Sequence, residues 1–165
     1  MDKASPPQAF NTFNPVHHVV VALPSAEAAE AMQQDLRRAG FADADITVYA
    51  PDEMRELASA EVENATLAAK VGQEYNLARM RLELAQSGCT FVVTPARQDA
   101  KVQAVADAAR RRGALRAQRY GTFIIEELTE VGEGLRQVGE SPDRGLDAQT
   151  TTGQEVQAKD RPAQR

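Results

Sequence analysis

Residues 17–40 read HHVVVALPSAEAAEAMQQDLRRAG, and this stretch sets the expectation for the whole fold. Its β-branched run, residues 17–23, is typical of a strand that is buried on both faces. Ser25 follows where its side chain can cap a helix, and Gly40 fits the position just past the helix end. The stretch therefore predicts a strand followed by an amphipathic helix, and residues 46–49 (ITVY) predict a second strand.

The same order of elements returns in the second half of the chain. Residues 90–93 (TFVV) predict a third strand, and Asp99 marks the start of a helix that ends near Gly113. We expect one long, twisted strand to follow over residues 115–127, with a bulge at Gly121. The chain therefore uses a strand–helix–strand unit twice.

Good helix formers fill the insertion between these units, residues 52–88. Two helices there, or one long bent helix, both fit the sequence. Two helices that run out and back would make the third strand antiparallel to the second, which gives a ferredoxin-like repeated β-α-β fold of the α/β (α+β) class. A single helix that crosses the sheet would instead give a doubly wound parallel sheet. We favour the ferredoxin-like fold with a helical insertion and keep the parallel sheet as the alternative.

The two ends of the chain differ from its centre. Residues 1–15 mix Pro, Asn and Ser without a period, so we expect a flexible arm in which Phe10 and Phe13 could dock. Large apolar residues are thinly spread over residues 129–165, and a segment of this kind buries too little apolar area to offset the entropy of ordering. The sequence thus predicts a single folded domain at residues 16–128 and a disordered C-terminal tail.

The composition limits the classes of protein to consider. The chain has 165 residues, a net charge of −5 and 42% hydrophobic residues. A net negative charge repels nucleic acid and anionic membranes, and no apolar run approaches the roughly 18 residues of a membrane helix. Residues 1–15 do not resemble a secretory signal. One cysteine, Cys89, is too few for an internal disulfide or a thiolate metal cluster. We expect a cytoplasmic domain with no membrane partner.

Motifs that carry chemistry are missing from the sequence. It contains no phosphate-binding glycine loop, no H-E-x-x-H and no C-x-x-C. His17 and His18 are consecutive on a predicted strand, so their side chains point to opposite faces and cannot share a metal ion. Cys89 follows Gly88 at the start of a strand, where a buried structural thiol is typical. We therefore assign no catalytic residue, no metal ligand and no cofactor.

Charge is distributed unevenly along the chain. Residues 25–63 hold ten acidic and three basic residues, whereas residues 97–120 hold seven basic and two acidic residues. A basic region on an acidic protein has three common explanations. It is a face exposed to solvent, a contact surface for another protein or a second copy of the chain, or a binding site for an anion or nucleic acid. The candidate basic contact patch consists of Arg110, Arg111, Arg112, Arg116 and Arg119.

Short motifs in both halves also carry a resemblance to a known family. These are residues 19–22 (VVVA), residues 28–41 from Ala-Ala to Gly-Phe, residues 45–48 (DITV), residues 92–93 (VV) and residues 112–114 (RGA). In these motifs the chain resembles bacterial general-stress proteins of the heat-induced YflT-like type. The resemblance implies a role in the stress response and no catalytic residues. That family often has an apolar Gly/Ala-rich middle, where this chain has charged helices, so a membrane role does not carry over.

These observations lead to a functional expectation. We expect a non-enzymatic interaction or regulatory module that is stress-linked and associates with itself or with another protein. The alternative is a small-molecule sensor with a ligand cleft between the sheet and the helical insertion, near His18, Tyr49, Tyr75 and Tyr120. Nucleic acid is a minority expectation for the partner, because the aromatic residues that an RNA-recognition sheet needs are missing. An enzyme comes third.

Overall fold

The structure is a computed structural model that describes residues 3, 6, 8–9, 12–67, 72–122 and 124–129. The chain divides into two units, residues 1–131 and residues 132–165. The second unit, and with it nearly all of the predicted disordered tail, lies outside the described residues. The fold below is that of the first unit.

A five-stranded antiparallel sheet forms the centre of this unit, in the order β4-β5-β3-β6-β7. Its strands are β3 (His18–Leu23), β4 (Thr47–Tyr49), β5 (Thr90–Pro95), β6 (Arg116–Tyr120) and β7 (Ile125–Glu127). In the register, Val20 lies opposite Val93 of β5 and Gln118 of β6. Every described strand pair in this sheet is antiparallel, so the alternative of a doubly wound parallel sheet is wrong.

Helical crossovers link strands that are not neighbours. Helix α1 (Ala26–Arg38) connects β3 to β4, with β5 between these two strands. Helix α4 (Asp99–Arg111) connects β5 to β6, with β3 between them. The insertion between the two strand–helix–strand repeats forms two helices, α2 (Pro51–Leu67) and α3 (Gln73–Gln86), which is one of the two arrangements that the sequence left open.

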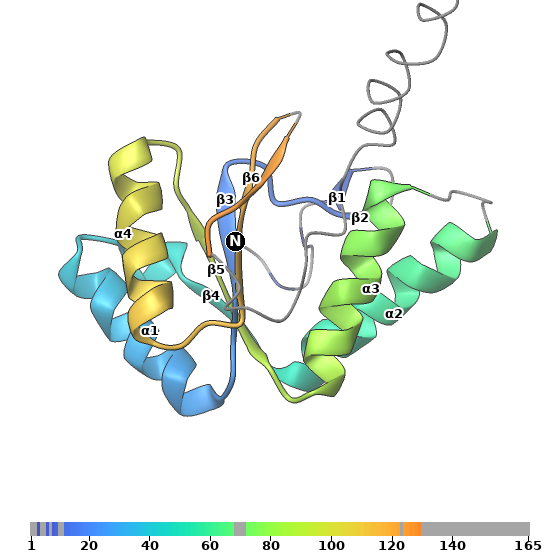
Figure 1. The fold of residues 1–165 in the computed structure, drawn as a ribbon, viewed down its shortest axis with the longest axis horizontal. Coiled ribbons are helices and arrows are strands. Elements are labelled where there is room, and N and C mark those ends of the chain that lie inside the picture. Colours follow the sequence, from blue (N-terminus) through green and yellow to red (C-terminus); the bar gives the residue numbers. More distant parts are fainter. Residues whose placement is uncertain are drawn as a thin grey trace, which may run out of the picture. The chain divides into compact units, whose positions relative to one another are not determined.

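The helices cover opposite faces of the sheet (Figure 1). Helices α1 and α4 pack on one face, where Val19 and Val21 of β3 join a core with Met32 and Leu36 of α1. Helices α2 and α3 lie on the other face, over a second core that includes Val20 and other residues. Alternate residues of β3 therefore enter different cores, as expected for a strand buried on both sides.

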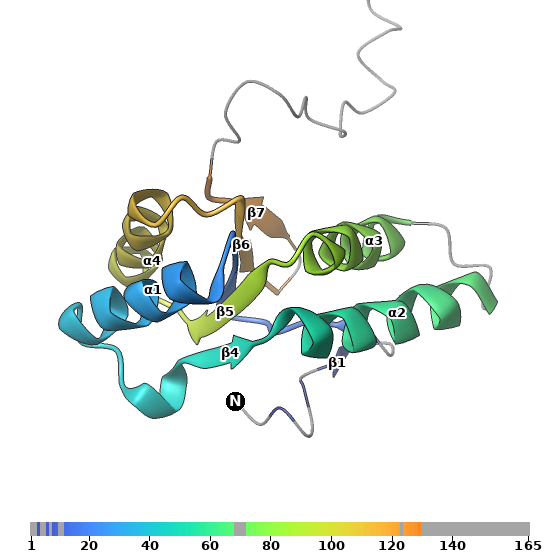
Figure 2. The ribbon, with the colours of Figure 1, turned by 90° about the horizontal axis from the view of Figure 1, so that it is seen from below.

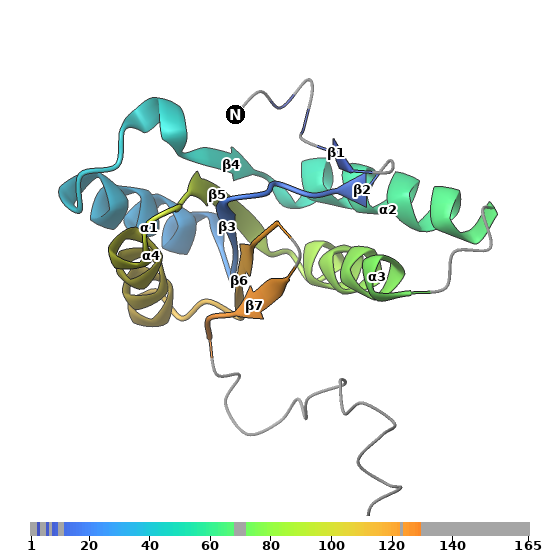
Figure 3. The same cartoon turned by 90° about the horizontal axis from the view of Figure 1, so that it is seen from above.

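The α2–α3 hairpin reaches beyond the sheet. Figure 2 shows α2 and α3 side by side, with much of their length outside the sheet that β3 to β7 form. A small two-stranded sheet of β1 (Gln8–Ala9) and β2 (Thr12–Phe13) lies beside α2, and β2 contacts both helices of the hairpin (Figure 3). Part of the segment expected to be a flexible arm is thus docked on the hairpin, while Phe10 lies outside the described residues.

Both ends of helix α1 have the residues and geometry that the sequence predicted. The Ser25 hydroxyl accepts a hydrogen bond from Ala28 N at 3.2 Å, which is the helix cap that the sequence predicted. Gly40 has φ 85°, a left-handed conformation that glycine adopts without strain, just after the helix end.

The expectation of one long strand over residues 115–127 is wrong. The chain instead turns after Gly121 and returns as β7, which pairs antiparallel with β6. Gly121 N donates to Ile124 O at 2.8 Å and closes the turn, and a Cβ on Gly121 would lie 2.7 Å from that oxygen. Gly121, which we expected at a bulge, instead lies where the backbone of Ile124 approaches too closely for a side chain to fit. The apolar pattern of this stretch could not reveal the turn, since Ile124 is 67% exposed.

Candidate functional site

A polar cluster lies inside the core between the sheet and the α2–α3 hairpin. It consists of Glu61 on α2, Arg81 on α3 and Tyr120 on β6, which we call the buried cluster. Arg81 Nη2 donates to Glu61 Oε2 at 2.5 Å, and Arg81 Nη1 donates to the Tyr120 hydroxyl at 2.8 Å. Arg81 is only 1% exposed, so this guanidinium crosslinks three elements without contact with solvent.

The N-terminal segment completes the buried cluster through Phe13. Its backbone N–H donates to Glu61 Oε1, and the Arg81 guanidinium stacks 5.3 Å from the centre of its ring. The ring also meets Tyr49 edge-on, with 6.0 Å between the centroids. We call the place that Phe13 occupies, among Tyr49, Glu61 and Arg81, the Phe13 site.

The electrostatics of the buried cluster favour the charged guanidinium. Burial would lower the pKa of Arg81, but Tyr120 and Glu61 more than offset burial and hold the pKa above its ordinary value. Burial raises the pKa of Tyr120, although Arg81 opposes the rise. Tyr120 therefore stays neutral at physiological pH, and its hydroxyl accepts the hydrogen bond from Arg81.

Sequence reasoning found Tyr120 but missed Glu61 and Arg81. A signal for both was present in the helical spacing. Glu61 continues the buried stripe of Met54 and Ala58 on α2, and Arg81 lies between the buried residues Ala78 and Ala85 on α3. A charged residue at the centre of an apolar stripe indicates a buried polar contact, because charges are rarely buried without a partner.

The structure brings two of the four predicted cleft residues into one core. Tyr49 and Tyr120 are buried in the same core, while Tyr75 is half-buried on α3. His18 is half-buried at the start of β3, where its Nδ1 lies 2.9 Å from Val16 O.

A small hollow does lie between the sheet and α3. Its volume is about 10 Å³, and its walls include Phe91 of β5 and Met80 and Leu84 of α3. None of the four predicted cleft residues lines it. A small-molecule site typically occupies about 300–1,000 Å³, so this hollow is far too small for one.

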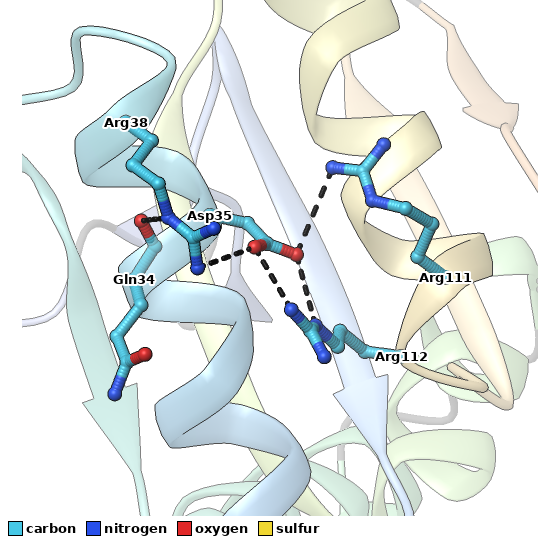
Figure 4. Close-up of polar contacts among 5 residues, drawn as sticks. All are labelled: Gln34, Asp35, Arg38, Arg111 and Arg112. Carbon is cyan, nitrogen blue, oxygen red and sulfur yellow. Dashed lines mark hydrogen bonds and ion pairs between the residues drawn. The ribbon is translucent and has the colours of Figure 1, made fainter.

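The predicted basic patch is extensively ion-paired within the chain. Three arginines converge on Asp35, a side chain on α1 that is 6% exposed (Figure 4). Arg112 donates to both Asp35 oxygens at 2.9 Å, Arg38 approaches one oxygen at 3.1 Å, and Arg111 lies at 3.7 Å. We call these four residues the Asp35 hub. The hydrogen bonds from Arg112 hold the pKa of Asp35 below its ordinary value of 3.8, although burial alone would raise it.

The other three arginines of the patch are also paired. Arg110 contacts Asp107 at 2.6 Å on the same helix. Arg116 contacts Glu127 at 2.8 Å, and Arg119 contacts Asp99 at 3.1 Å and Glu126 at 3.5 Å. The patch therefore carries much less unbalanced charge than a count along the sequence indicates. Arg111 is the member with the loosest pairing, and its side chain is 59% exposed.

Other kinds of site were sought in the part of the chain that the structure describes. There, no three His, Cys, Asp or Glu side chains gather as they would to bind a metal ion. Cys89 is buried, with its Sγ 3.6 Å from the Ser87 hydroxyl. Among those residues, no helix has both the length and the hydropathy that a membrane span needs.

Comparison with protein families, with curated proteins and with solved structures found no match to this chain. Its function is therefore inferred from its own residues.

Proposed function

We propose that this chain is a non-enzymatic interaction module that associates with further copies of itself through the α2–α3 hairpin. The observation that carries the proposal is the width of the apolar surface on α3. Ala78 and Ala85 mark its buried stripe. Large half-buried side chains flank that stripe on both sides, Tyr75 and Leu82 on one side and Leu77 on the other.

Helix α1 offers the contrast. Its large apolar residues, Met32 and Leu36, are fully buried, and the rest of its surface is polar or alanine. A helix with apolar residues on more than one side is favoured when a second surface covers it. The projecting hairpin is the part of the described molecule that has such residues and little of the sheet beneath it (Figure 2).

The core is proposed to be a ferredoxin-like domain. Two features support this proposal: the order β4-β5-β3-β6 within the sheet, and the two helical crossovers that each pass over one strand. The stress-linked role that the resemblance to YflT-like proteins implies is part of the proposal as the setting in which the module acts.

Unpaired charged side chains support an electrostatic contribution to self-association, which salt would weaken. Among the described residues, Glu56 and Glu63 on α2 have no ion-pair partner, and neither has Arg97 near α4. Contacts of opposite sign between copies therefore remain available after the internal pairing. The small hollow beside α3 offers space for about one water molecule, so it does not itself support a small-molecule site.

The test is the mass of the full chain by analytical ultracentrifugation, over a range of protein and salt concentrations. We expect an oligomer whose dissociation constant rises about tenfold in the Leu77→Gln variant, because the lost apolar contact weakens association. Leu115→Gln is the matched control, because Leu115 is 47% exposed and lies outside the hairpin. A wild-type chain that stays monomeric, or a hairpin variant that associates as the wild type does, would contradict the proposal.

Reversal of Arg110, Arg111 and Arg112 to Glu is not a clean test of charge complementation between copies. Arg112 holds Asp35 within the chain, so its reversal places two carboxylates side by side and weakens the fold itself. Arg111→Glu alone is the better variant, because Arg111 is exposed and lies 3.7 Å from Asp35.

A further inference from the structure

The turn that joins β2 to β3 is strained. His17 has φ 65° and is the non-glycine residue with a positive φ in the described chain. The turn is closed by a hydrogen bond from His18 N to Pro15 O at 3.0 Å, which places His17 at the third turn position. Glycine adopts a positive φ at that position without strain, whereas any residue with a Cβ is strained there, Asn and His less than a β-branched residue.

The N-terminal segment on the far side of this turn docks on the hairpin and on β4. Phe13 contacts Glu61, Arg81 and Tyr49, and Lys3 binds Glu53 at 2.7 Å while it lies 5.3 Å from the ring centre of Tyr49. The segment pairs with itself, β1 with β2, and not with the five-stranded sheet. Its docking therefore depends on side-chain contacts that any copy of the segment can make.

We propose that two copies of this chain exchange their N-terminal segments, so that Phe13 of each copy occupies the Phe13 site of the other. The exchanged dimer keeps the contacts of Phe13 and Lys3, because the segment and its site are chemically the same in both forms. Opening of the turn into an extended link releases the strain at His17, and short strained hinges favour such exchange. This inference rests on the proposed self-association and gives a structural route to it.

Four backbone hydrogen bonds oppose the exchange. Within the turn, Val16 N donates to Asn14 O at 2.9 Å and His18 N donates to Pro15 O at 3.0 Å. His17 N also donates to Tyr120 O at 2.7 Å, and His17 O accepts from Ala96 N at 2.9 Å. These bonds depend on the closed conformation of the hinge, whereas the strain favours the open one. The hinge is thus balanced between two states, and a substitution at His17 shifts the balance with little loss of packing because the side chain is exposed.

A series of substitutions at His17 tests the proposal. His17→Gly removes the strain, and we expect the dimer association constant to fall by about an order of magnitude. His17→Val keeps the N–H but disfavours positive φ strongly, and we expect the association constant to rise by a similar factor. His17→Asn is the matched control, because it removes the imidazole and still tolerates the left-handed conformation. It should behave as the wild type does. Native mass spectrometry and sedimentation measure the ratio of dimer to monomer.

A second variant separates exchange from contact between hairpin surfaces. Phe13→Ala removes the anchor, so exchanged dimers should be lost, and circular dichroism reports whether the fold persists. If Gly and Val at position 17 leave the association constant unchanged, or shift it in the same direction, exchange is wrong. If the wild type is nevertheless an oligomer, the exchange is wrong but the proposed association through the hairpin is retained. A wild-type monomer that dimerises as His17→Val supports exchange and contradicts the proposed function.

Discussion

The two faces of the sheet are closed by different means. On the α1–α4 face the core is apolar, and the charged Asp35 hub lies at its rim, where its arginines reach solvent. On the α2–α3 face a charged pair, Glu61 and Arg81, lies inside the core. The first face depends on amphipathic helices that repeat along the sequence. The second depends on a buried ion pair whose guanidinium also bonds Tyr120 of the sheet.

The largest expected effect is on the buried cluster. Arg81→Met leaves the Glu61 carboxylate buried without its cation, and we expect the free energy of unfolding to fall by about 3–5 kcal/mol. Urea denaturation of the full chain measures this change.

The matched control for this variant is the double substitution Glu61→Gln/Arg81→Met. It removes both charges and keeps an acceptor for the Phe13 N–H, so it should be clearly more stable than Arg81→Met alone. If Arg81→Met costs less than about 1 kcal/mol, the contrast between the two faces would not hold.

A smaller effect is expected at the rim of the other face. Asp35→Asn removes a carboxylate that accepts two hydrogen bonds from Arg112, and the expected loss of stability at neutral pH is about 2 kcal/mol. The pKa of Asp35 is lowered in the folded chain, so its contribution is present above its ordinary value of 3.8. That contribution disappears as the pH falls through the folded value.

Denaturation midpoints at neutral pH and at a pH below that ordinary value test this sign. The wild type should lose more stability on acidification than Asp35→Asn does, so the two should converge in acid. Parallel pH profiles for the two proteins would show that Asp35 has no such role.

The smallest expected effect concerns the local sequence signals of α1. Ser25→Ala removes the hydroxyl that accepts from Ala28 N, and we expect a loss of about 1 kcal/mol in the free energy of unfolding. Ser25→Asp should keep the cap and serve as the control. Equal loss in both variants would mean that the cap contributes nothing and that packing of Met32 and Leu36 alone holds the helix.

Much of the fold could be predicted from the sequence. The strand at residues 17–23, the capped helix after Ser25 and the helical insertion follow from hydrophobic period, capping residues and helix propensity. The hairpin at Gly121 could not be predicted in the same way. The apolar run around Ile124 has the pattern of a strand, whereas the turn depends on close approach between Gly121 N and Ile124 O.

The sequence by itself determined the helices and the central strands, since these follow from interactions among residues a few positions apart, but not β1, β2 and β7. It also placed charged residues at the centres of the α2 and α3 stripes. Only the tertiary structure decided that Glu61 and Arg81 meet each other, Tyr120 and the N-terminal Phe13. It likewise decided that the arginines near the end of α4 meet carboxylates of other elements, among them Asp35 and Glu127. The physical reason is that pairing of charges depends on distance in space, which a count of charges along the chain does not contain.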